Sequence, residues 1–164
     1  MREYSKVSPN LWQSKRFNSL ASDDARYLYL YLLTNSHQTS AGCYRLPNGY
    51  ACDDLRWPVD RYVAARTALI DADLVQFDAD TSEVRIVRWF RHNPPATTDH
   101  LTGIVRQLER LQSEKLATDA IADAEAAWEE VERDRLEKAS RKTKASGVAN
   151  FPDRLRTNYL SNRG

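Results

Sequence analysis

The chain has few of the residues that mark several large protein classes. Its 164 residues include only 2 cysteines, 5 glycines and 6 prolines, and 24 basic side chains nearly balance 23 acidic ones, for a net charge of +1. Cys43 and Cys52 belong to no CxxC or histidine-flanked pair, so neither a disulfide framework nor a zinc site is expected. The near-neutral charge excludes a protein that holds nucleic acid by bulk electrostatics alone. Any such binding must come from local patches.

Long hydrophobic runs are missing as well. No segment approaches the roughly 18 consecutive apolar residues of a membrane span, and the first ten residues hold no apolar stretch typical of a secretory signal. We therefore expect a cytoplasmic protein with no membrane partner. Glycine-rich phosphate loops, an H-E-x-x-H run and a nucleophile with a histidine partner are also absent. The sequence thus predicts neither an enzyme nor a bound cofactor or metal ion.

Apolar residues make up 41% of the chain, which suffices for a core. Ser22, followed by two aspartates, is a strong helix start, and the helix that follows is apolar around most of its circumference. Further segments have the periodicity of a short strand, two helices separated at Trp57-Pro58, and the two strands of a hairpin. In chain order these segments lie at residues 22–34, 42–46, 50–56, 58–73, 74–77 and 84–87.

The order helix, strand, helix, helix and hairpin is that of a winged helix-turn-helix, in which the early strand completes a small three-stranded antiparallel sheet. We therefore predict a mostly helical α+β fold, with this winged-helix domain over residues 1–95 and C-terminal helices after it. The helical extension is expected over residues 96–141 and a basic tail over residues 142–164. Charge supports this division, because residues 117–132 carry six acidic and no basic side chains, whereas residues 133–164 carry nine basic and three acidic ones.

Several segments of the first 95 residues resemble the N-terminal domains of phage replisome-organiser and DnaD-like proteins. They include KVSPNLW, DARYLYLYLL, GCYRLPNGY and WFRHNPP, which begin at residues 6, 24, 42 and 89. The family often has a glycine where this chain has Asp73. The resemblance implies a phage or prophage protein in the cytoplasm of a host bacterium. It would bind DNA, commonly at a replication origin, and help to bring the replicative helicase or its loader there.

The helix over residues 58–73 would be the recognition helix, entering the major groove of DNA, while the hairpin would touch the backbone. Such a helix uses polar and basic side chains for phosphate and base contacts. We expect Arg61 to be exposed near the helix start, so that Arg61→Ala weakens binding, and Arg66 to lie at the margin. Solvation, or pairing with Asp60 and Asp71, is an equal alternative for these two arginines. The candidate DNA-binding residues are Arg61, Arg66, Arg56, Arg85, Arg88, Arg91, Lys15 and Arg16.

Beyond residue 95, apolar residues at helical spacing predict an amphipathic helix from about Asp99 to Leu116. The ten-residue step from Leu111 to Ile121 breaks a strict heptad, so either a bend near Thr118-Asp119 makes a helical hairpin or one long helix carries two offset stripes. The stripe needs a partner: the winged domain, another copy of the chain or a different protein. We favour self-association. The residues of this candidate interface are Leu101, Ile104, Val105, Leu108, Leu111, Ile121 and Trp128.

Our first hypothesis for function is a non-enzymatic winged-helix DNA-binding protein of phage replication. A protein-interaction module that inhibits a host enzyme or defence complex is an alternative, because the predicted recognition helix has few basic residues. Transcriptional repression is a further alternative, which differs from the first hypothesis in its DNA target rather than in its physics.

Overall fold

A computed structural model of the chain describes residues 5–148, with side chains for residues 5–143. The described chain divides into two compact units, of which the first ends at Val131 and the second begins at Glu132. The boundary predicted after residue 95 is therefore misplaced, because the next two helices contribute to the core of the first unit. Most of the predicted basic tail, residues 149–164, lies outside the described residues.

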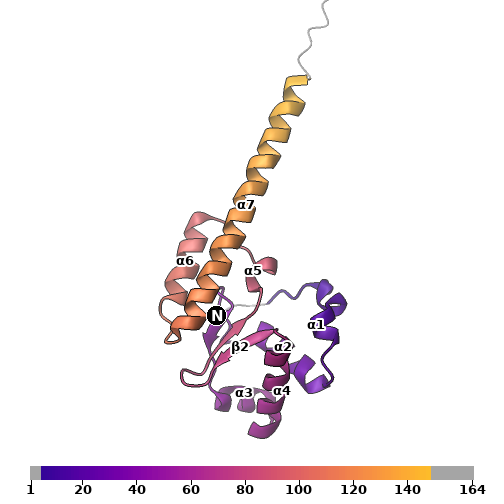
Figure 1. Cartoon of the computed structure of the whole chain (residues 1–164), viewed down its shortest axis with the longest axis vertical. Helices are drawn as coiled ribbons and strands as arrows, with labels where there is room; N and C mark the ends of the chain where they lie inside the picture. The colour runs from indigo at the N-terminus through magenta and orange to yellow at the C-terminus, as the bar shows by residue number, and fades with distance from the viewer. Residues whose placement is uncertain (1–4, 149–164) are drawn as a thin grey trace, which may run out of the picture. The chain divides into compact units, whose positions relative to one another are not determined.

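The fold is mostly helical α+β, as the sequence predicts, and residues 5–148 contain seven α-helices and one three-stranded antiparallel sheet (Figure 1). A 3-10 turn precedes them, and the last helix continues past Val131. In chain order the elements are η1 (Pro9–Gln13), α1 (Lys15–Asn18), α2 (Asp23–Thr34), β1 (Cys43–Arg45), α3 (Asn48–Leu55), α4 (Val59–Asp71), β2 (Val75–Asp78), β3 (Glu83–Ile86), α5 (Trp89–His92), α6 (Thr98–Leu108) and α7 (Glu114–Val148).

Helix α2 is the central helix of the first unit. The Ser22 hydroxyl accepts a hydrogen bond from the Asp24 backbone N–H at 3.2 Å, and the two aspartates of the first turn meet the positive end of the helix dipole. The buried face of α2 consists of Ala25, Leu28, Tyr29 and Leu32. This helix start and this buried face confirm the prediction from capping and periodicity.

The sheet has the strand order β1-β3-β2, so β3 lies in the middle. Its register pairs Cys43 of β1 and Gln76 of β2 with Arg85 of β3. Because side chains alternate along a strand, Val84 and Ile86 share one face of β3, and Glu83 and Arg85 share the other. Both charged residues are buried. Glu83 binds the turn between α6 and α7, and Arg85 binds α7.

Helices α6 and α7 form a hairpin, one of the two arrangements that the sequence allows, but the chain turns at residues 109–113 rather than near Thr118-Asp119. The predicted helix from Asp99 to Leu116 is therefore wrong at its C-terminal end. The Glu83 carboxylate accepts hydrogen bonds from the backbone N–H groups of Gln112 at 3.0 Å and Ser113 at 2.8 Å. These bonds satisfy donors at the start of α7 and fix the turn against the sheet.

Arg85 makes a second link between the sheet and α7. Its guanidinium forms an ion pair with Asp123 and hydrogen bonds with the Asp119 carbonyl at 3.3 Å and the Gln76 amide oxygen at 2.7 Å. The side chain is only 8% exposed. The prediction that Arg85 contacts a DNA backbone is therefore wrong, because the side chain is enclosed by β2 and α7.

The apolar stripe of the C-terminal helices is covered by the chain itself. Ile104 and Leu108 are completely buried, and they belong to the same core as α2 and the sheet. Leu101, Leu111 and Ile121 pack partly against that core. Val105 and Trp128 are half-buried. Of the three partners considered for this stripe, the structure shows the chain's own N-terminal domain, which covers Ile104 and Leu108.

We expect Glu83→Gln to lower the free energy of unfolding by about 1–3 kcal/mol, since hydrogen bonds to a charged acceptor contribute about that much. The amide has one acceptor oxygen for two backbone donors, which leaves a buried N–H without its partner. Urea denaturation followed by circular dichroism measures this change. An unaltered midpoint would show that the turn before α7 is held by apolar packing alone.

Candidate functional site

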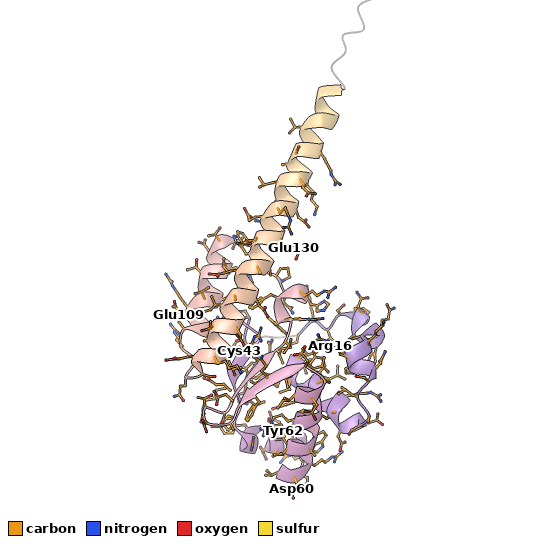
Figure 2. All side chains as sticks on the ribbon, in the orientation of Figure 1. Arg16, Cys43, Asp60, Tyr62, Glu109 and Glu130 are labelled. Atoms are coloured by element: carbon orange, nitrogen blue, oxygen red, sulfur yellow. The ribbon has the colours of Figure 1, made fainter. Side chains whose placement is uncertain are left out.

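The solvent-facing side of α4 has few of the basic side chains that a helix in the major groove of DNA uses for phosphate and base contacts. Tyr62, Ala65 and Leu69 form its buried face. Val59 and Ile70 are large apolar side chains that remain 51% and 40% exposed. The other exposed positions of the helix are Asp60, Arg61, Ala64, Thr67 and Asp71. Asp60 lies at the extreme lower end of the view in Figure 2. This surface therefore combines apolar groups with two carboxylates and a single cation.

That cation, Arg61, is held by Asp24 of α2. Its Nε and Nη2 atoms donate to the two carboxylate oxygens of Asp24 at 2.8 and 2.5 Å, and its guanidinium lies 4.3 Å from the centre of the Trp57 ring. The ion pair lowers the pKa of the Asp24 carboxyl from its usual value. The predicted exposure of Arg61 is confirmed, but the alternative of pairing with Asp60 and Asp71 is wrong, because the partner is Asp24. Arg61 thus presents a neutralised charge to solvent.

The other candidates near α3 and α4 are also engaged within the chain. Arg66 is half-buried, donates to the Asn48 side-chain oxygen at 2.7 Å, and stacks 3.7 Å over the Phe77 ring. Arg56 adopts a left-handed conformation between α3 and α4 and pairs with Asp53 at 3.1 Å. Among the described residues around α3 and α4, the predicted DNA-binding arginines therefore do not gather into one positive surface.

Three other predicted cations line a single cleft. Arg16, Arg88 and Arg91 contribute to the wall of a cavity of about 390 Å³, together with Lys6 and His92. These residues come from the segment before η1, from α1, and from the chain around α5. Among the described residues that line the cleft there is no aspartate or glutamate. We call this cavity the basic cleft.

Two of these arginines lie in and directly before the single turn of α5. Arg88 has φ 61° and precedes the single turn of α5, so the chain turns sharply as it leaves the sheet. The Arg91 backbone N–H donates to the Arg88 carbonyl at 3.2 Å, which ties Arg88 to the turn of α5. A left-handed backbone at a residue other than glycine costs about 1–3 kcal/mol and is concentrated at functional sites.

Arg16, labelled in Figure 2, is anchored by the end of α4. Its Nη1 atom donates to the backbone carbonyl of Asp73 and pairs with the carboxylate of the same residue, both at 2.8 Å. Asp73 has φ 52° and follows the C-terminus of α4, a position at which helices commonly place glycine. Its carboxylate does not line the cleft, but it offsets part of the charge of Arg16.

The rest of the cleft wall is apolar or neutral. Trp89 is buried, its indole N–H donates to the Ser40 carbonyl at 2.9 Å, and a Cβ added at Gly42 would lie 2.2 Å from its ring. Burial raises the pKa of the Tyr29 hydroxyl to about 12, so this side chain is a neutral phenol. The other apolar lining residues are Val7, Leu11, Leu33, Leu74, Ile86 and Val87. The cleft can thus accept a molecule that is both apolar and anionic.

Sequence reasoning found part of this site. Arg16, Arg88 and Arg91 are candidate DNA-binding residues of the sequence, and all three line the cleft, but the sequence does not indicate that they meet. Lys15, also a candidate, is exposed and does not line the cleft. Lys6 and His92 were missed, although both lie in segments that carry the family resemblance. Their clustering is a tertiary feature, because they are far apart along the chain.

Within residues 5–148, no group of three or more His, Cys, Asp or Glu side chains is arranged to hold a metal ion, and no helix is long and apolar enough to cross a membrane. Comparison with known proteins gives no matching family model, curated protein or solved structure. The basic cleft is therefore interpreted from its own chemistry and from the sequence resemblance.

Proposed function

We propose that this chain is a nucleic-acid-binding protein and that its phosphate contacts are made in the basic cleft. The observation that supports this most strongly is the gathering of Arg16, Arg88 and Arg91, with Lys6 and His92, around one cavity whose described lining has no carboxylate. Although the net charge of the chain is only +1, a cleft lined by positive charges alone focuses a positive electrostatic potential that attracts phosphate.

The sequence resemblance to phage replisome-organiser and DnaD-like domains supports a role in phage DNA replication, with a helicase or its loader as protein partner. The order of α2, β1, α3, α4 and the β2–β3 hairpin, with β3 central in the sheet, supports the winged-helix interpretation. A non-enzymatic DNA-binding protein of replication is therefore the function we propose.

We expect DNA to bind at the basic cleft and not at α4. Asp60 and Asp71 on the exposed side of that helix would face phosphates of like charge, which is unfavourable. The β2–β3 turn is no better suited to a DNA backbone, because Asp78 at the end of β2 and Asp80 in the turn are acidic and no basic residue lies between the two strands. We therefore no longer expect α4 to enter a major groove or the hairpin to touch the backbone.

Fluorescence anisotropy with labelled DNA tests the proposal directly. We expect binding at low salt that weakens as salt is added, with log K falling by about 0.7–0.9 per log unit of salt for each phosphate contacted. Contacts with the three arginines alone predict a slope of about −2 to −3. Failure to bind single-stranded or duplex DNA at low salt would contradict the proposed function.

Asp73→Gly is expected to raise DNA affinity by up to about fivefold, because exposed ion pairs contribute about 0–1 kcal/mol and Arg16 would be relieved of one. Glycine adopts the left-handed backbone of residue 73 without strain, so the fold should be retained. Anisotropy and thermal unfolding measure the two effects. A fall in affinity at unchanged stability would mean that Asp73 orients Arg16 productively rather than competing with phosphate for it.

Protein interaction remains a second candidate function, and the exposed side of α4 favours it. Val59 and Ile70 leave apolar surface in solvent, and Asp60 and Asp71 add negative charge beside it. Such a surface suits a protein partner of basic character, including a host enzyme or defence complex that the chain would inhibit. A stoichiometric protein partner that survives nuclease treatment and is lost in Ile70→Glu supports this function.

A further inference from the structure

We infer that the basic cleft takes up a single unpaired nucleotide, with the base against its apolar wall and the phosphate on its arginines, so that the chain prefers single-stranded DNA. This inference rests on the proposed function and adds the form of nucleic acid that the site accepts.

The size and lining of the cleft support an inserted base. Its volume of about 390 Å³ lies within the range of about 300–1,000 Å³ typical of small-molecule pockets. Tyr29, Trp89 and several aliphatic residues line it beside the cations. A phosphate alone would use the arginines and leave the half-buried apolar lining residues, Val7, Leu11, Leu33 and Val87, in contact with water. A nucleotide provides a flat apolar group and an anion together, and therefore matches both parts of the lining.

Duplex DNA matches the cleft poorly. A paired base is stacked inside the helix, and an enzyme or binding protein that takes it out must pay for unstacking and unpairing. An unpaired base is already accessible to aromatic and apolar side chains, and single-strand-binding proteins use such contacts together with a positively charged groove. The cleft therefore favours single strands, because a base of duplex DNA can enter it only after the free-energy cost of unstacking and unpairing has been met.

The exposed aromatic pair next to α4 is a weaker alternative for base stacking. Tyr27 is 58% exposed and its ring lies 5.8 Å from that of Trp57. The cation beside the Trp57 ring, Arg61, already donates from Nε and Nη2 to the two carboxylate oxygens of Asp24. A base stacked there would bring its phosphate to a neutralised charge, whereas the basic cleft supplies several cations with no carboxylate in its described lining.

Three probes of about 20 nucleotides, longer than the roughly 4–16 nucleotides that one binding fold covers, separate the base from the phosphate. They are oligothymidylate, an abasic strand of the same length, and a duplex of mixed sequence, each measured by anisotropy at the same salt concentration. We expect oligothymidylate to bind at least about fivefold more tightly than either of the other two, because base stacking adds to the phosphate contacts. Equal affinity for all three overturns the inference and leaves the proposed function standing. No binding to any of them overturns the proposed function itself.

Photocrosslinking locates the base. A single strand that contains bromodeoxyuridine is irradiated with the intact chain, and the linked peptides are identified by mass spectrometry. We expect adducts on Tyr29 or Trp89, although both are far less exposed than Trp12 and Tyr27. The more exposed aromatics thus serve as an internal control. Adducts confined to Trp12, Tyr27 or Trp57 would show that the base stacks elsewhere and would overturn the inference.

Discussion

Replacing two arginines of the basic cleft together, as Arg88→Gly with Arg91→Gln, should weaken binding of single-stranded DNA on the order of 100-fold. Each charge-assisted contact contributes about 1.5–3 kcal/mol, and the lower end of that range, about 3 kcal/mol for two lost contacts, corresponds to a change on the order of 100-fold. The slope of log K against log salt should become shallower by about 1.4, since single strands contribute about 0.7 per phosphate contact. Glycine suits the left-handed backbone of residue 88, so this loss should occur without a loss of stability.

The chain offers a closely matched control at α3 and α4. Arg56 also has a left-handed backbone, with φ 56°, and Arg61 is an exposed arginine that does not line the cleft. The double variant Arg56→Gly with Arg61→Gln removes the same two charges in the same chemical way. We expect its DNA affinity to stay within about twofold of the parent, because exposed, internally paired charges contribute little. If this control loses affinity and the cleft variant does not, DNA binds at α4 as the sequence first suggested.

The elements of the N-terminal unit could be predicted because their signals are local. Ser22 with its two following aspartates marks the start of α2, and Trp57-Pro58 separates α3 from α4. The two-residue period of the hairpin places β2 and β3. Each of these signals depends on neighbours within a few residues, and each gives an element of the observed type within a few residues of its observed bounds.

The basic cleft could not be predicted in the same way, because it is assembled from distant parts of the chain. Lys6 and Arg91 lie 85 positions apart in sequence, and only the packing of η1, α2 and the end of the hairpin brings their segments to one cavity. The engagement of Arg61 by Asp24 is equally nonlocal, since these residues lie on different helices. Helical projection shows that Arg61 faces outward, but it does not show which group lies opposite.

The position of the turn between α6 and α7 could not be predicted from the sequence for a related reason. Its strongest determinant is the Glu83 carboxylate, which is 29 and 30 residues away from the two N–H groups that it accepts. The spacing of apolar residues in the C-terminal segment does not indicate that contact. The same limit applies to the choice of partner, because an amphipathic stripe predicts that something covers it without indicating whether the cover is the same chain or another copy.

Leu108→Ala should lower the free energy of unfolding by about 2–5 kcal/mol, as truncation of a buried leucine does when the surrounding core cannot collapse onto the space left behind. Leu108 is 0% exposed and lies in one core with residues of α2, α4 and the sheet, so the lost contacts are within the chain. Urea denaturation gives the change in stability, and light scattering gives the molar mass. Leu136→Ala is the control: Leu136 is 71% exposed on α7, and its truncation should change stability by no more than about 0.5 kcal/mol. A Leu108→Ala variant with undiminished stability that converts a dimer into monomers would restore self-association through this stripe, because only contacts between copies give that combination.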